Sequence, residues 1–414
     1  MTEKIYGLIG KSLKHSWSVP IHQELGCENY ELYELQEQEL ESFLREKPIG
    51  GLNVTIPYKQ TVMPYCASLD PYAEAIGCVN TLVPDENGQL HGYNTDAFGL
   101  SYIAKRAGIS FRGAKVVILG SGGTSLTAQA VAKEEGAREI VVISRMGENN
   151  YTNIAFHYNA DILINTTPVG MYPNNGECLI YLTNFTNLKG VLDVIYNPER
   201  TALLMQAEEL GIPFSDGLPM LVAQAVAAEE KFFDKKIDES EIERITAKLR
   251  RDMTNIVLIG MPGVGKTVVG NALAEISGRK VIDIDEEIVK TAGYSIPEIF
   301  LRNGEEAFRK MEREAVKRAG KENGVIIMTG GGVVTRPENY EPLHQNGYIC
   351  ELKRDLSKLP IDGRPISQKV SAEDLYRERA PLYEGFRDIS VENNAGIREA
   401  AEKIWKNFNE NFGN

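Results

Sequence analysis

Short apolar runs alternate with amphipathic stretches along most of the chain. The apolar runs have the length of buried strands, and the stretches between them repeat apolar residues at helical spacing. This alternation predicts an α/β protein with largely parallel sheets, because consecutive parallel strands need a crossover segment between them. Strands are expected at residues 5–9, 51–55, 115–119, 140–144, 162–165, 191–194, 256–259, 280–284, 325–329 and 348–353.

A charged segment at 238–251 separates two groups of these strands. It follows a long helical stretch, 221–234, and precedes the strand expected near residue 256. We therefore expect two modules joined by a helical junction over 238–253. The first module combines residues 1–98 and 216–250 in one subdomain with 99–215 in another, and the second module covers 254–414.

Each module carries a glycine-rich loop between an expected strand and an expected helix. Such a loop binds phosphate, because backbone N–H groups and a helix N-terminus then point at the anion. The first loop suits the pyrophosphate of a dinucleotide, although Ser125 replaces the third glycine of the usual fingerprint. The second is a full Walker A pattern, in which Lys266 reaches the β- and γ-phosphates and Thr267 ligates Mg²⁺. The expected ligands are Gly120, Ser121, Gly122, Gly123, Thr124 and Ser125 in the first loop and Gly260, Gly263, Val264, Gly265, Lys266 and Thr267 in the second.

The residues after the next strand of the first module favour one dinucleotide. Enzymes that use NAD carry an acid about 20 residues beyond the loop, where it binds the ribose 2′-hydroxyl. This chain has Ser144 and Arg145 there. An arginine pairs with a 2′-phosphate, so NADP is favoured over NAD. The alternative is a solvated arginine at a strand end.

Two pairs of residues are candidates for the chemistry. Lys59 and Asp96 each follow a short apolar run, and a lysine held charged by an aspartate can protonate a carbonyl oxygen as hydride arrives. By spacing alone, a surface ion pair is the alternative. Asp283 and Asp285 end the strand after the Walker loop and would share one face of it, serving Mg²⁺ and an acceptor hydroxyl respectively. A pair that caps a helix is the alternative.

Composition narrows the class of protein. With 414 residues, 43% hydrophobic and 25% charged, the chain suits a soluble protein of two to three domains. The net charge of −13 argues against a nucleic-acid or anionic-membrane partner. Five scattered cysteines without a CxxC pair suit a reduced cytoplasm. We expect no signal peptide, no spanning segment and small-molecule partners, and homo-oligomerisation stays open.

Residues 1–250 resemble shikimate dehydrogenase. Eight motifs agree in the order of that family, namely the first glycine loop together with His15-Ser-Trp-Ser18, Asn53-Val-Thr-Ile-Pro-Tyr-Lys59, Gly77-Cys-Val-Asn-Thr81, Asn94-Thr-Asp96, Asn165-Thr-Thr-Pro-Val-Gly-Met171, Asp193-Val-Ile-Tyr-Asn-Pro198 and Gly217-Leu-Pro-Met-Leu-Val-Ala-Gln-Ala225. The resemblance implies a two-subdomain module with a Rossmann NADP domain. It implies that Lys59 and Asp96 are the catalytic pair.

The same resemblance assigns the remaining residues of the first module. Substrate-binding residues are expected to be Ser16, Ser18, Thr55, Asn80, Asn94, Tyr196 and Gln224, and further cofactor contacts Ser144, Arg145, Thr166 and Gly217. Ser16 and Ser18 as helix caps and Asn80 and Asn94 as turn residues are the structural alternatives. Met146 replaces the threonine usual in the family, and the stretch between Arg145 and Asp161 is short, so part of the cofactor domain is expected to be trimmed.

Residues 254–410 resemble shikimate kinase, a P-loop NTPase with a nucleoside-monophosphate-kinase-like fold. The resemblance is carried by the Walker loop, Asp283-Ile-Asp285, Phe308-Arg309, Gly330-Gly-Gly332, Gly363-Arg-Pro365 and Arg379-Ala-Pro-Leu-Tyr383. It implies that Asp285 orients the acceptor hydroxyl, that Arg309 and Arg379 bind the substrate carboxylate beside Gly330, Gly331 and Gly332, and that Arg364 reaches ATP from a lid. The segment between Leu352 and Arg364 is shorter than the family's lid region.

These resemblances predict a bifunctional enzyme of the shikimate pathway of aromatic amino acid biosynthesis. It would reduce 3-dehydroshikimate with NADPH and then phosphorylate shikimate with Mg-ATP. One alternative is a quinate/shikimate dehydrogenase that uses NAD, fused to the same kinase. The other is an active dehydrogenase fused to a weakly active or regulatory nucleotide-binding module, which the short lid region motivates.

Overall fold

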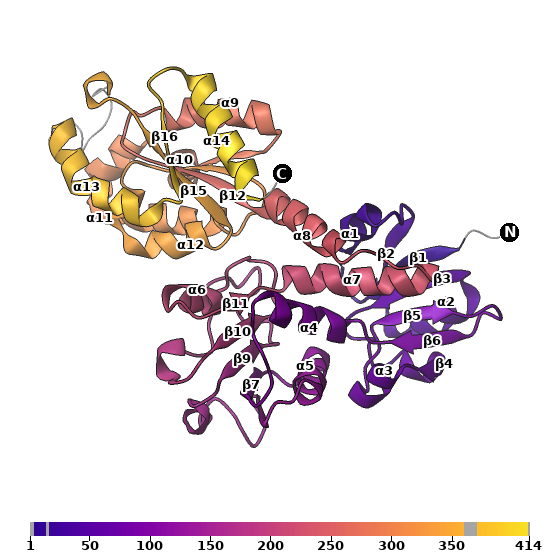
Figure 1. Cartoon of the computed structure of the whole chain (residues 1–414). Coiled ribbons are helices and arrows are strands. Elements are labelled where there is room, and N and C mark those ends of the chain that lie inside the picture. Colours follow the sequence, from indigo (N-terminus) through magenta and orange to yellow (C-terminus); the bar gives the residue numbers. More distant parts are fainter. Residues whose placement is uncertain (1–3, 14–15, 360–370, 413–414) are drawn as a thin grey trace. The chain divides into compact units, whose positions relative to one another are not determined.

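The computed structural model describes residues 4–13, 16–359 and 371–412 (Figure 1). The chain divides into two compact units. Unit 1 comprises residues 1–169, 178–196 and 203–246, and unit 2 comprises 170–177, 197–202 and 247–414. The boundary at residues 246–247 falls inside helix α8 (Ser240–Met253), which lies in the segment expected to be the junction.

Unit 1 begins with a mixed six-stranded sheet in the order β2-β1-β3-β5-β6-β4. Its strands are β1 (Ile5–Gly10), β2 (Tyr30–Glu34), β3 (Ile49–Val54), β4 (Cys66–Leu69), β5 (Thr81–Pro84) and β6 (Leu90–Tyr93). Its helices are α1 (Ser18–Glu24), α2 (Leu40–Glu46), α3 (Pro71–Ile76), η1 (Glu37–Glu39) and η2 (Met63–Tyr65). The strand β3 is buried along its whole length, and α7 (Leu218–Phe233) returns to pack on it.

The second sheet of unit 1 is fully parallel, in the order β11-β10-β9-β7-β8. Its strands are β7 (Lys115–Leu119), β8 (Glu139–Ile143), β9 (Ile162–Asn165), β10 (Gly190–Asp193) and β11 (Phe214–Ser215). The helices around it are α4 (Asp96–Arg106), α5 (Gly123–Glu134), α6 (Ala202–Glu209), η3 (Ile154–His157) and η4 (Leu182–Asn184). The stretch between β8 and β9, described in full, contains the 3₁₀ turn η3 and no α-helix, as its shortness predicts.

Unit 2 has a parallel five-stranded sheet in the order β13-β14-β12-β15-β16. Its strands are β12 (Asn255–Ile259), β13 (Val281–Asp283), β14 (Ile326–Met328), β15 (Gly347–Lys353) and β16 (Ile389–Glu392). Its helices are α9 (Lys266–Ser277), α10 (Ile284–Ala292), α11 (Ile296–Ala319), α12 (Tyr340–His344), α13 (Ala372–Phe386), α14 (Ile397–Asn411), η5 (Val333–Thr335), η6 (Pro337–Asn339) and η7 (Leu356–Lys358). Helix α11 is interrupted at Gly304, which has a φ of 81°.

The expected strands are confirmed to within about two residues at each end, the usual spread of strand boundaries. One placement is wrong. Asp285 does not share the strand with Asp283, because β13 ends at Asp283 and Asp285 lies in the first turn of α10. Across the described residues, no helix is long and apolar enough to cross a membrane.

Candidate active sites

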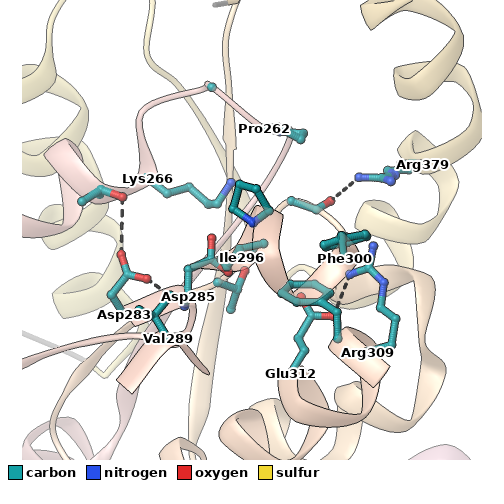
Figure 2. Close-up of a pocket in the computed structure, with 18 residues that line it drawn as sticks. Pro262, Lys266, Asp283, Asp285, Val289, Ile296, Phe300, Arg309, Glu312 and Arg379 are labelled. Atoms are coloured by element: carbon teal, nitrogen blue, oxygen red, sulfur yellow. Dashed lines mark hydrogen bonds and ion pairs between the residues drawn. The ribbon is translucent and has the colours of Figure 1, made fainter. Parts of the chain in front are cut away.

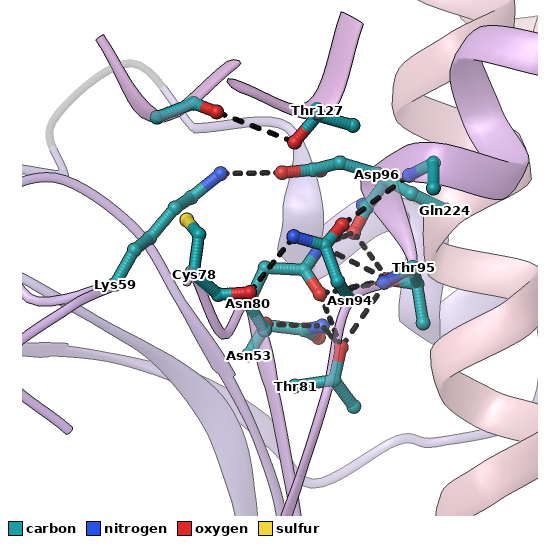
Figure 3. Close-up of polar contacts among 12 residues, drawn as sticks. Asn53, Lys59, Cys78, Asn80, Thr81, Asn94, Thr95, Asp96, Thr127 and Gln224 are labelled. Carbon is teal, nitrogen blue, oxygen red and sulfur yellow. Dashed lines mark hydrogen bonds and ion pairs between the residues drawn. The ribbon is translucent and has the colours of Figure 1, made fainter. Parts of the chain in front are cut away.

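The centre of the first site is an ion pair between Lys59 and Asp96. Lys59 follows the carboxyl end of β3, and Asp96 is the first residue of α4. The Lys59 Nζ lies 2.5 Å from Asp96 Oδ2, and both side chains are largely buried (Figure 3). Burial by itself lowers the pKa of Lys59, but the Asp96 carboxylate outweighs burial and raises it. The lysine therefore stays protonated and able to donate a proton.

An amide network lies directly beneath this ion pair. Asn80 Oδ1 accepts the Thr95 backbone N–H at 2.8 Å, and Asn80 Nδ2 lies 3.5 Å from Gln224 Oε1 on α7. Asn94 Nδ2 donates to the Cys78 carbonyl at 2.9 Å (Figure 3). The structure thus brings three predicted substrate residues together around the residue that precedes Asp96. The turn-stabilising contacts expected as an alternative are present as well, and they do not exclude a ligand.

The remaining predicted substrate residues follow neighbouring parallel strands. β1 and β3 pair in register up to Ile9 and Val54, so residues that follow their carboxyl ends meet at one edge of the sheet. Ser16 and Ser18 come after β1, and Thr55 comes directly after β3. Ser16 Oγ lies 3.0 Å from Ser18 Oγ. Trp17 is the N-cap of α1 and makes no side-chain capping bond, but Ser16 Oγ accepts the backbone N–H of Ser18, the first residue of the helix, at 3.2 Å. The capping alternative is therefore present for Ser16.

The first glycine loop leads from β7 into α5. Gly120 has a φ of 107°, which favours glycine, and a Cβ there would lie 2.8 Å from Thr166 Oγ1. Gly122 caps α5 without a side-chain bond and has open space beside it, so the orphan amides of the helix are free to meet an anion. Ser121 is exposed and Thr124 half-buried, whereas Ser125 is fully buried, which favours a packing role for it.

The loop lies beside the ion pair. Cys78 Sγ is 3.3 Å from the position that a Cβ on Gly123 would occupy, and the Cys78 carbonyl also accepts from Asn94. Gly217, the N-cap of α7, lies so close to the Val194 carbonyl that a Cβ would be 2.1 Å from its oxygen. Two further predicted residues, Ser144 and Tyr196, are half-buried, and burial raises the pKa of the Tyr196 phenol.

Arg145 follows β8 and is exposed. Its exposure and the lack of an ion pair with any residue that the structure describes agree with the alternative, a solvated arginine at a strand end, and they also leave the guanidinium accessible to a 2′-phosphate. The next residue, Met146, is 96% exposed.

The second site is a cavity of about 440 Å³ in unit 2 (Figure 2). Its walls come from the Walker loop, the β13–α10 junction, α11, the glycines after β14 and α13. The predicted site residues that line it are Gly263, Lys266, Thr267, Asp283, Asp285, Arg309, Gly330, Gly331, Gly332 and Arg379. Arg364 lies outside the described residues.

The Walker loop has the conformation that phosphate binding needs. Gly260, Gly263 and Gly265 have φ values of 136°, 90° and 99°, which favour glycine. Lys266 Nζ donates to the backbone carbonyls of Gly260 and Met261 at 2.8 and 3.1 Å, so the ammonium is hydrogen-bonded to the Walker loop itself. In Walker loops, glycines and a lysine at these positions cradle the triphosphate.

Asp283 has two roles in the structure. Its Oδ1 accepts the N–H groups of Asp285 and Glu286 and caps α10, so the capping alternative is present. Its Oδ2 lies 3.5 Å from Thr267 Oγ1. A carboxylate oxygen next to a hydroxyl at a Walker loop is the donor set that Mg²⁺ prefers. The residues therefore fit a magnesium ion.

Asp285, which lies next to Asp283 at the β13–α10 junction, also lines this cavity. Its Oδ1 is buried and has no hydrogen-bond partner among the described residues. Burial raises its pKa, the Asp283 carboxylate raises it further, and Lys266 and Arg309 oppose them. An orphaned carboxylate oxygen in a cavity is an acceptor for a ligand hydroxyl.

Two buried arginines complete the cavity. Arg309 Nη1 donates to Glu312 Oε2 at 2.7 Å, and Arg379 Nη1 donates to the Gly331 carbonyl at 2.9 Å (Figure 2). A Cβ on Gly332 would lie 2.4 Å from the Arg309 guanidinium, which explains a glycine there. Glu312 escaped the sequence analysis, although its spacing of three residues from Arg309 on a helix predicts their contact.

One further residue at this site, Asn393, was not predicted from the sequence. Asn393, after β16, donates from Nδ2 to the Val264 carbonyl at 2.8 Å and so braces the Walker loop. A lone asparagine after an edge strand carries no signal of such a contact in the sequence.

Comparisons with known proteins divide the chain in the same way. The family model of the shikimate dehydrogenase substrate binding domain matches residues 8–82, and that of shikimate kinase matches residues 262–409. A shikimate dehydrogenase (NADP⁺) of Clostridium perfringens (strain SM101 / Type A) is 35% identical over 268 residues, covering 60% of this chain and 98% of that protein. The solved chorismate mutase/shikimate 5-dehydrogenase fusion protein of Clostridium acetobutylicum is similar with a TM-score of 0.57 and 34% identity, covering 60% and 98% of the two chains. Shikimate 5-dehydrogenase of Thermus thermophilus in complex with NADP(H) and shikimate has a TM-score of 0.53 at 26% identity, covering 59% and 99%.

Proposed function

The chain belongs to the shikimate dehydrogenase family and carries a shikimate kinase domain, and we propose that it catalyses two consecutive reactions on one small acid. The first reduces 3-dehydroshikimate to shikimate with NADPH, and the second phosphorylates shikimate to shikimate 3-phosphate with ATP. The observation that carries the proposal is the presence, in one chain, of a buried Lys59–Asp96 ion pair and of a cavity lined by the Walker loop together with aspartates and arginines.

In the reductase, Lys59 is the proton donor. NADPH supplies a hydride to the C3 carbonyl carbon, and the Lys59 Nζ protonates the carbonyl oxygen as negative charge develops on it. Asp96 keeps the lysine charged and aims it through their 2.5 Å contact. Asn80, Asn94 and Gln224 orient the ring hydroxyls, and Ser16 and Ser18 bind the carboxylate.

In the kinase, Asp285 accepts the proton of the 3-hydroxyl. Arg309 and Arg379 bind the substrate carboxylate, since a guanidinium matches a carboxylate in two hydrogen bonds. Mg-ATP supplies the phosphoryl group, and the Lys266 ammonium neutralises charge on the phosphates. Thr267 and Asp283 would hold the magnesium ion, which would neutralise negative charge on the phosphates. Arg364, which lies outside the described residues, would reach ATP.

A coupled assay tests the proposal directly. Purified protein is given 3-dehydroshikimate, NADPH and ATP, and shikimate 3-phosphate is followed by mass spectrometry. We expect NADPH oxidation without ATP and formation of shikimate 3-phosphate when ATP is added. Absence of NADPH oxidation would refute the reductase assignment, and shikimate-independent ADP release would refute the kinase assignment.

A second candidate function rests on the short stretch of sequence between Leu352 and Arg364. In this version the reductase is active and the C-terminal unit binds nucleotide without efficient transfer. The two versions differ in one measurement. ATP binding by the protein without shikimate-dependent ADP release supports the second candidate, and ADP release at a rate comparable with NADPH oxidation supports the bifunctional enzyme.

Replacing Arg145 by alanine tests the choice of NADP over NAD. We expect the KM for NADPH to rise about ten- to 100-fold, because a charge-assisted hydrogen bond to the 2′-phosphate contributes about 1.5–3 kcal/mol. The KM for NADH, which has no 2′-phosphate, stays unchanged. Equal effects on both cofactors, or faster turnover of the parent protein with NADH, would favour the quinate/shikimate type of dehydrogenase.

The pKa of Asp285 gives the kinase a predicted pH dependence. Asp285 has to be ionised to accept the hydroxyl proton, and its pKa is raised above the ordinary value of 3.8 by burial and by Asp283. The kcat/KM for shikimate therefore falls as pH drops through a value above 3.8, and unchanged far-UV circular dichroism shows that the protein retains its fold there. An acid limb at or below 3.8 would contradict this role.

The five cysteines are all free in the structure, and for this reason we propose that the protein acts in the cytoplasm. Its partners are the two small-molecule substrates and their cofactors.

A further inference from the structure

A buried histidine–glutamate pair joins two helices of unit 1. His22 lies on α1 and Glu229 on α7. His22 Nδ1 is 2.7 Å from Glu229 Oε1, and both side chains are 0% exposed. Burial lowers the pKa of His22, and the Glu229 carboxylate opposes this only in part. A carboxylate accepts and does not donate, so Nδ1 carries the proton of this hydrogen bond.

Burying this pair lowers the stability of the folded protein. Glu229 Oε2 and His22 Nε2 have no hydrogen-bond partner among the described residues. The Nζ of Lys235 lies 3.9 Å from Glu229 Oε2, beyond hydrogen-bond distance. A buried charged group whose hydrogen bonds are only partly satisfied is often less stabilising than an apolar side chain of the same size. Stability alone therefore does not explain a glutamate at this position.

His22 is connected to the substrate side of the reductase through two routes. On α1 it lies four residues after Ser18, so both side chains share one face of the helix. The His22 ring also stacks on Tyr30, with ring centroids 3.8 Å apart. Tyr30 Oη donates to Asn53 Oδ1 at 2.7 Å.

Asn53 continues the second route to the site. Asn53 Nδ2 lies 3.3 Å from Thr81 Oγ1, and Thr81 Oγ1 donates to Asn80 Oδ1 at 3.0 Å (Figure 3). Asn80 in turn accepts the N–H of Thr95, the neighbour of Asp96. An unbroken series of hydrogen bonds therefore runs from Tyr30, on which His22 stacks, to Thr95, the residue that precedes Asp96.

We propose that Glu229 and His22 are positioning residues for the dehydrogenase substrate. The pair fixes α1 against α7 and holds the Tyr30 ring where its hydroxyl donates to Asn53. In this way it positions Ser18 and the hydrogen-bond network of Asn80, which bind the substrate. The inference rests on the proposed reductase function. It concerns the organic substrate, because Ser18 lies on α1 and Gln224 on α7, whereas the glycine loop and Arg145 belong to other elements. Gly217, the predicted cofactor contact at α7, is the N-cap of that helix and lies at the opposite end from Glu229.

The test compares Glu229→Ala with Glu229→Gln in the full-length protein. We expect Glu229→Ala to raise the KM for 3-dehydroshikimate about ten-fold, because a small misplacement of positioning groups weakens the reacting geometry strongly. The KM for NADPH and the kinase KM for shikimate stay unchanged. Glu229→Gln keeps an acceptor for the His22 Nδ1–H and restores the KM to within about two-fold of the parental value, because the hydrogen bond that orients His22 is retained. Glu41→Ala, which removes an exposed ion pair with Arg45, is the matched control.

Several outcomes would overturn the inference. An unchanged KM for 3-dehydroshikimate in Glu229→Ala, or an equal rise of both reductase KM values, would assign the pair to folding alone. Should Glu229→Ala not fold, Tyr30→Phe decides by the same criterion, since it removes only the bond to Asn53. Absence of NADPH oxidation by the parent protein would instead refute the proposed function, so the two failures are distinguishable.

Discussion

Replacing Lys59 by alanine lowers the rate of 3-dehydroshikimate reduction by about 10³-fold, within the range of about 10²–10⁴ that a general acid contributes. The substitution removes the proton donor and leaves the buried Asp96 carboxylate without its partner. The kinase reaction does not use this pair, so shikimate-dependent ADP release stays at the parental rate. Single-turnover NADPH oxidation and a separate ADP-release assay measure the two effects.

Two further variants make this result specific. Lys47→Ala removes an exposed lysine of the same unit and is expected to leave both reactions unchanged. Asp96→Asn keeps the shape of the side chain that pairs with Lys59 but removes its charge. The pKa of the buried Lys59 then falls, so we expect the rate of 3-dehydroshikimate reduction to decrease first at high pH. If Lys59→Ala reduced its substrate at near-parental rates in folded protein, another group would have to be the proton donor.

The fold could be predicted where strands are buried on both faces. β7, β9 and β12 are central and fully buried, and each reads as a continuous apolar run. The strands that escaped prediction include β2 and β16, which lie at sheet edges and mix polar with apolar residues. The mixture of polar and apolar residues removes the pattern, and the edge position alone does not, because β8 and β13 also lie half-exposed at sheet edges and could be predicted.

Site residues could be predicted where they belong to one local sequence motif. The Walker loop and the residues that follow β3 are local, so their spacing defines what they do. Asp285 shows the limit of such reasoning, because Asp283 caps α10 and thereby turns the chain from strand to helix between the two acids. Asn393 and Glu229 show another limit. Their contacts join segments 129 and 207 residues apart, and no local pattern encodes such a pairing.

Replacing Lys266 by alanine has the reverse effect of the Lys59 substitution. The Lys266 ammonium lies on the Walker loop and is almost fully buried, so its removal takes away the charge that the β- and γ-phosphates meet. We expect shikimate-dependent ADP release to fall by about 10²–10³-fold, as for the loss of one preorganised electrostatic group. NADPH oxidation stays at the parental rate, because Lys59 and Asp96 are in the other unit.

The control for this variant is Lys280→Ala, which removes an exposed lysine next to β13 and is expected to change neither reaction. Loss of both activities in a Lys266→Ala protein with parental circular dichroism would contradict two independent sites. Retention of ADP release would show that nucleotide is bound elsewhere. The reciprocal result, one activity lost with each lysine, is what two separate sites require, because neither lysine lies within the other site's set of contacts.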